Sequence, residues 1–216
     1  MAAPLIKAEE DWTEAHRFVL GGCIARGYEL ADAGISQIPA NVRCNPNVPY
    51  TRGNVRWLIV DALIFEACAA GELPGVSAEW RANRSGPSSL EIQSANTVVY
   101  VAHLQSPDSP PAASEIKLGT MDYNQGVFEF IQQDARTTAV QLLLVHSGKE
   151  FAALRAYYDP ENRGRHYQIG SNIMTGRVQA TGFETESVSL VEPTLVLPPT
   201  AGQFSIQRDA TEAGAS

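Results

Sequence analysis

The sequence predicts an α+β protein, in which a helical N-terminal portion is followed by a mostly β C-terminal portion with a mixed or antiparallel sheet. In the first third of the chain, apolar residues recur at three- and four-residue spacing, as they do on one face of a helix. After about residue 88 the spacing changes to the alternation that is typical of strands. We expect a helical portion over 1–85, a β-rich portion over 88–197 and a flexible tail over 198–216.

The composition is that of a globular protein, since 44% of the 216 residues are hydrophobic and 19% are charged. The net charge of −8 argues against a general attraction to nucleic acid or to an anionic membrane. Three widely spaced cysteines without a Cys-x-x-Cys pair predict neither a zinc site nor a disulfide scaffold, so a reducing compartment is expected. No apolar run approaches the roughly 20 residues that span a bilayer, and no signal peptide is visible. We therefore expect a soluble cytoplasmic protein with no membrane partner.

Two long helices are expected in the N-terminal portion, over residues 8–32 and 54–73. The pair Gly21-Gly22 predicts a break near the middle of the first helix, and Asn54 is the expected N-cap of the second. Prolines and asparagines predict an irregular connection over 33–50.

Apolar residues cover most of the circumference of the second helix, which predicts a central, buried position. Asp61 and Glu66 are the exceptions. At roughly 100° per residue they point about 140° apart, so one of them is expected to be partly buried. A buried carboxylate needs a cationic partner or has a raised pKa, and an arginine partner is the interpretation we favour.

A basic stretch without acids lies between the two helices and in the first turns of the second. Its arginines either pair with acids elsewhere, as exposed charges usually do, or form an anion-binding surface. The arginines of the stretch, and those that would extend this surface, are Arg43, Arg52, Arg56, Arg81 and Arg84.

The C-terminal portion follows a polar linker over 75–88 and contains several segments with strand-like spacing. The expected strands are 90–93, 97–105, 116–118, 139–147, 166–174 and 177–191. Turns are expected at Ser94–Asn96 and 159–164, whereas 124–135 and 150–158 suit either a helix or a strand.

The triplet Glu115-Ile116-Lys117 is the strongest catalytic candidate, since phosphate-loop, dinucleotide, nucleophile-elbow and His-Glu-x-x-His motifs are absent from the sequence. On a strand, Glu115 and Lys117 would point to the same face. The triplet resembles the Glu-x-Lys half of the PD-(D/E)xK nuclease superfamily, whose helix, strands, helix and strand the stretch 54–147 could supply. The resemblance implies that Asp108 and Glu115 hold Mg²⁺ while Lys117 orients or deprotonates water. Either Glu91 or Glu66 would supply a further carboxylate.

Two other groups of polar residues could bind a ligand. Arg163, Arg165 and His166 surround an expected turn and could grip a phosphate or a carboxylate, although a hairpin with ordinary surface charge is the interpretation we favour. His103 and His146 end the two most apolar strands, so they meet if those strands are neighbours.

The sequence therefore leaves two functional hypotheses open. In the first, the protein acts on nucleic acid as a Mg²⁺-dependent nuclease. In the second, it is a non-catalytic protein-binding or assembly module, including a structural component of a larger assembly, whose partner is a protein or a second copy of the chain.

Overall fold

The computed structural model describes residues 3–43, 45, 47–82, 88–130 and 139–175. Contacts divide the chain into units 1–182 and 183–216, and the second unit lies outside the described residues. Within the described residues the elements, in chain order, are α1 (Ala3–Asp11), α2 (Glu14–Ser36), α3 (Ala40–Arg43), α4 (Val48–Ala69), β1 (Ser77–Arg81), β2 (Ser89–Gln93), β3 (Thr97–His103), α5 (Glu115–Phe130), β4 (Val140–Ser147), β5 (Phe151–Tyr157) and β6 (His166–Ile169). The α+β prediction, with helices first and a mixed sheet afterwards, is confirmed. No helix in the described ranges is long and apolar enough to cross a membrane.

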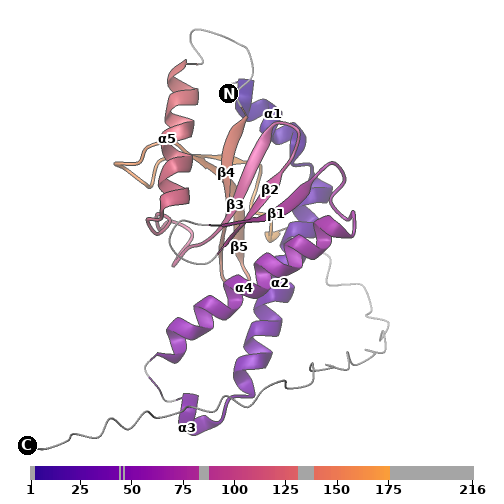
Figure 1. Cartoon of the computed structure of the whole chain (residues 1–216), viewed down its shortest axis with the longest axis vertical. Coiled ribbons are helices and arrows are strands. Elements are labelled where there is room, and N and C mark those ends of the chain that lie inside the picture. Colours follow the sequence, from indigo (N-terminus) through magenta and orange to yellow (C-terminus); the bar gives the residue numbers. More distant parts are fainter. Residues whose placement is uncertain (1–2, 44, 46, 83–87, 131–138, 176–216) are drawn as a thin grey trace, which may run out of the picture. The chain divides into compact units, whose positions relative to one another are not determined.

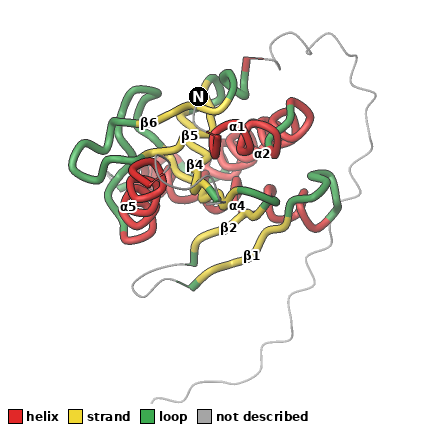
Figure 2. Tube along the Cα trace, turned by 90° about the horizontal axis from the view of Figure 1, so that it is seen from above, coloured by secondary structure: helices red, strands yellow, loops and turns green. Residues whose placement is uncertain are grey.

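The six strands form one sheet in the order β1-β2-β3-β4-β5-β6 (Figure 1). All neighbouring pairs are antiparallel except β3 and β4, which α5 connects in parallel. The side chains of β3 and β4 point alternately to the two faces of the sheet, and each face carries its own hydrophobic core. One core joins the sheet to α1, α2 and α4, and the other joins it to α5. Figure 2 shows α5 on one side of the sheet and α1 and α2 on the other.

The first predicted helix is interrupted at a different place from the one expected. The break lies at Trp12 and Thr13, where Thr13 N-caps α2 by accepting a hydrogen bond from the backbone N–H of His16. The predicted break at Gly21-Gly22 is wrong, since α2 continues through both glycines. Glycine instead serves packing in this helix: a Cβ on Gly27 would lie 2.5 Å from Cγ2 of Val60, so its absence lets α2 and α4 approach closely.

The second predicted helix begins earlier than expected. Asn47 occupies the N-cap position of α4 and a proline stands in its first turn, where a missing N–H costs nothing. Asn54 therefore lies inside the helix, and the prediction of a cap there is wrong. The connection over 33–50 is also more regular than predicted, because it contains the end of α2, the short α3 and the start of α4.

Strand β1 replaces part of the predicted linker 75–88. Four of its five residues are exposed, because it is the edge strand of the sheet, and no apolar alternation reveals it in the sequence. The predicted strands at 90–93, 97–105 and 139–147 are confirmed, as are the turns Ser94–Asn96 and 159–164. Strand β6 ends earlier than predicted. The predicted strand 177–191 and tail 198–216 lie outside the described residues, as does Arg84.

The predicted strand 116–118 is wrong, because these residues form the first turn of α5. Ser114 precedes the helix and its Oγ accepts a hydrogen bond from the backbone N–H of Lys117, while an acidic residue occupies the first turn. Inward-facing residues then recur at helical spacing, at Thr120, Met121, Asn124 and Val127. The helix alternative for 124–135 holds as far as residue 130, and the rest of that segment is not described.

Candidate functional site

The carboxyl ends of β3 and β4 bring two histidines together. His103 and His146 are register partners in the parallel pair, and their ring centroids lie 5.5 Å apart. The prediction that they meet if their strands are neighbours is confirmed. In α/β sheets, ligands bind outside the carboxyl ends of parallel strands, where the chain crosses over the sheet. A ligand site is therefore expected at this end of the sheet.

His146 is fully buried and bonded to α2. Its Nδ1 lies 3.0 Å from the Tyr28 hydroxyl, which accepts a hydrogen bond from the backbone N–H of Gly148 at 3.1 Å. Burial, helped by the neighbouring His103 and Lys117, lowers the pKa of His146 to about 3, so its ring is neutral. Whether the Tyr28 hydroxyl or Nδ1 donates depends on the tautomer of the ring, whose second nitrogen is Nε2. That nitrogen is buried without a hydrogen-bond partner among the described residues.

The arginines of the basic stretch support this arrangement from α4. Arg52 and Arg56 both donate to Oδ1 of Asp32, at 3.0 and 2.7 Å from their Nη2 atoms. The Arg56 guanidinium also lies 4.8 Å from the centre of the Tyr28 ring. Of the two interpretations of this stretch, pairing with an acid elsewhere is the one that holds for these two arginines.

Asp61 and Lys117 interact electrostatically next to the histidines. Asp61 is 1% exposed, and burial raises its pKa to about 7, although a hydrogen bond from the Trp57 side chain and the charge of Lys117 act in the opposite direction. Its Oδ1 has no hydrogen-bond partner in the described part of the chain. Burial also lowers the pKa of Lys117, against the influence of Asp61. The favoured prediction of an arginine partner is wrong: the cation whose charge acts on Asp61 is Lys117 from α5, and the carboxyl has the raised pKa that was the alternative.

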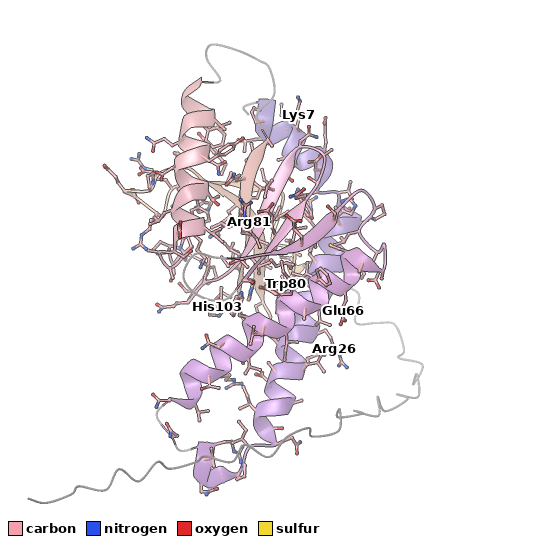
Figure 3. The ribbon with its side chains drawn as sticks, viewed as in Figure 1. Lys7, Arg26, Glu66, Trp80, Arg81 and His103 are labelled. Carbon is pink, nitrogen blue, oxygen red and sulfur yellow. The ribbon has the colours of Figure 1, made fainter. Side chains whose placement is uncertain are left out.

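Lys117 and His103 line a cavity of about 730 Å³ between α4, the end of β3, the following loop and the start of α5. Figure 3 labels His103 at this end of the sheet. The lining includes three basic side chains, those of His103, Lys117 and Arg163, and no carboxylate among the described residues that form it. Trp57, Pro110 and Pro111 supply apolar wall. The lining is thus a local exception to the acidic character of a chain with net charge −8, although burial lowers the pKa of both His103 and Lys117.

Arg163 comes from the turn between β5 and β6, where Nη1 donates to the carbonyl of Pro111 at 3.4 Å. The other two predicted ligand-binding residues lie elsewhere. Arg165 pairs with Asp159 at 3.3 Å, and the His166 ring packs against Tyr157 at a centroid distance of 4.9 Å. The turn is therefore partly an ordinary charged hairpin, and it contributes one arginine to the cavity.

The structure does not bring the predicted catalytic residues together. On α5, Glu115 and Lys117 point about 160° apart at roughly 100° per residue, so the expectation that they share a face is wrong. Lys117 lines the cavity just described, whereas Glu115 lines another. Asp108, the predicted second metal ligand, is exposed in the loop between β3 and α5. Among the described residues, no group of three or more His, Cys, Asp or Glu side chains could hold a metal ion.

The cavity that Glu115 lines measures about 410 Å³ and lies between α5 and the outer strands. Arg81 and Tyr100 also line it, and both donate to Oε2 of buried Glu91, at 2.6 and 2.5 Å, while Gln93 donates to Oε1. Burial alone would raise the pKa of Glu91, but these hydrogen bonds outweigh it and lower the pKa. The carboxylate is thus held ionised and fully bonded.

Sequence reasoning missed Trp57 and the prolines of the 105–112 loop as parts of a site. Trp57 fits the pattern of a core residue on a buried helix, and the loop offers only turn composition. They line the cavity together because the loop that follows β3 lies next to α4. No known family model matches the chain, and comparison with curated proteins and with solved structures gives no significant match.

Proposed function

We propose that the protein binds a small phosphorylated ligand of nucleotide size in the cavity at the carboxyl ends of β3 and β4. The observation that supports this most strongly is the lining of the cavity, which joins His103, Lys117 and Arg163 without a carboxylate. Arginine binds phosphate in proteins as a planar fork, so Arg163 is the side chain expected to hold the phosphate, with His103 and Lys117 beside it.

The size and walls of the cavity favour a ligand larger than a free ion. A volume of about 730 Å³ lies within the range of about 300–1,000 Å³ that is usual for small-molecule sites. Trp57 and the two prolines offer a surface on which a planar base could stack.

Titration calorimetry with adenosine 5′-monophosphate, inorganic phosphate and uncharged adenosine tests the proposal. The nucleotide is expected to bind, more weakly at high salt, and adenosine is not. Arg163→Met should weaken nucleotide binding by about 10- to 100-fold, which corresponds to one hydrogen bond to a charged group. Arg165→Met is the matched control, since Arg165 already pairs with Asp159, and it should bind as the unmodified protein does. Equal loss in both variants, or no binding of any phosphate, would refute the assignment.

A metal-dependent nuclease is the second candidate, supported by the order of elements from α4 to β4, which is helix, three strands, helix and strand. In this candidate, Glu115 would act from the cavity bordered by the Glu91 network. Cleavage of DNA and RNA with and without Mg²⁺ is the test. It should be lost in Glu115→Ala, and cleavage that survives this substitution would exclude Glu115 from the reaction.

A further inference from the structure

Lys117 differs from the other lysines of the chain, Lys7 and Lys149. Its side chain is half-buried and lines the cavity of the proposed phosphate site, whereas Lys149 is exposed at the β4–β5 turn. Although the charge of Asp61 acts on it, no ion pair or side-chain hydrogen bond is formed by its ammonium group within the described residues. A half-buried amine without a bonded partner is readily deprotonated and is then a nucleophile.

The groups that face Lys117 come from every element around it. Asp61 lies on α4, His103 ends β3, and neutral His146 lies near the end of β4. Asp61 favours the ammonium form of the lysine, and burial favours the neutral amine. Because burial outweighs the carboxylate, the pKa of Lys117 is lowered, which favours the neutral amine more than in a solvent-exposed lysine.

We propose that Lys117 is an amine nucleophile that forms an imine with the carbonyl group of a phosphorylated aldehyde or ketone bound in this cavity. This inference rests on the proposed function, since the phosphate must be held by the basic lining for the carbonyl group to reach Nζ. It narrows the ligand class from phosphorylated molecules in general to those that also contain a reactive carbonyl group.

The step balances without an oxidant or a reductant. The lone pair of the neutral Nζ attacks the carbonyl carbon, the C–N bond forms and the π electrons move to oxygen. Proton transfer from nitrogen to oxygen gives a carbinolamine. A proton from solvent water then converts its hydroxyl group into a leaving water molecule while the nitrogen lone pair forms the C=N bond, and the iminium ion can return a proton to water.

Pyridoxal 5′-phosphate is a suitable probe, since it combines an aldehyde with a phosphate and its imine can be fixed by borohydride reduction. The full chain is incubated with the probe, reduced and digested, and each lysine peptide is quantified by mass spectrometry. Because the bound phosphate holds the aldehyde near Nζ, the label on Lys117 should exceed that on Lys7 and Lys149 by about ten-fold or more. This is far less than the rate advantage that proximity can give. Lys117 should also react at lower pH than Lys149, and pyridoxal without phosphate should lose the preference.

Lys117→Arg keeps the charge and should abolish the selective label, whereas Lys149→Arg should leave it unchanged. Binding of pyridoxine 5′-phosphate, which has no aldehyde, is measured in parallel. If this analogue binds but the lysines are labelled equally, the role of Lys117 as a nucleophile is refuted, whereas the phosphate site is retained. If the analogue does not bind, the proposed function fails first. Selective labelling that persists in Arg163→Met would show that the phosphate does not direct the reaction, and would overturn the inference.

Discussion

Replacing Asp61 with asparagine should stabilise the protein at high pH and change its stability little at low pH. A buried carboxyl whose pKa rises on folding from 3.8 to about 7 binds its proton more tightly in the folded state. The contribution of this tighter proton binding to the free energy of unfolding is therefore complete below pH 3.8 and is lost as the pH rises to about 7. At 1.36 kcal/mol per pKa unit, the shift corresponds to about 4 kcal/mol, which is an upper bound because buried sites relax around a charge.

Urea unfolding of the unmodified protein and of Asp61→Asn at pH 4.5, 6 and 8 measures this effect. Asparagine keeps the shape of the side chain and its acceptor for the Trp57 hydrogen bond, so the difference between the two proteins isolates the charge. The free energy of unfolding of the variant should exceed that of the unmodified protein by a margin that grows up to about pH 7 and then stays constant. A difference independent of pH, or a variant that is less stable at pH 8, would refute the raised pKa and the cost of the buried charge.

Two further substitutions test the packing that positions the site. Asn124→Leu removes three hydrogen bonds by which α5 holds the Gln141 backbone and the Tyr157 carbonyl. Three unpaired buried groups at about 1–3 kcal/mol each predict a loss of about 3–9 kcal/mol in the free energy of urea unfolding, and a loss below about 1 kcal/mol would contradict this. Gly27→Ala should destabilise by about 1–3 kcal/mol, because the new methyl group collides with Val60. The control Gly34→Ala lies on the same helix with no atom within 4 Å and should stabilise by up to about 1 kcal/mol. If thermal unfolding shows both alanines shifting stability in the same direction, close packing of α2 on α4 is not the reason for Gly27.

The elements that the sequence predicted well are those in which spacing and burial agree. β4 has five consecutive buried residues and needs no other signal, and α2 and α4 show apolar residues at helical spacing over more than 20 residues each. β1 could not be predicted in the same way, because an edge strand with one neighbour exposes most of its side chains and leaves no apolar period to detect. The exposed fraction of a strand residue depends on its place in the sheet, which local sequence does not encode.

The charged groups of the site were visible in the sequence, but their pairing was not. A carboxylate inside an apolar helix predicts burial and either a cationic partner or a raised pKa, and Asp61 is buried with a raised pKa. The cation whose charge acts on it is a lysine 56 positions later, on an element predicted as a strand. Arginines closer in sequence were the natural candidates, yet two of them point to Asp32, because α2 lies beside α4 along its first turns.

The misassigned segment 116–118 decides where the chemistry of the molecule lies. Residues 115–118, which alternate in polarity, fit a strand as well as the first turn of a helix, and only the serine before them and the spacing after them distinguish the two. As a strand, the segment would put Glu115 and Lys117 on one face. As the start of α5, it sends the two side chains to different cavities and makes the chain cross the sheet, so that β4 returns parallel to β3. A parallel return is what brings His103 and His146 to the same end of the sheet. Had β4 returned antiparallel, as in a hairpin, the carboxyl ends of the two strands would lie at opposite ends of the sheet. No basic cavity would then form between the two histidines.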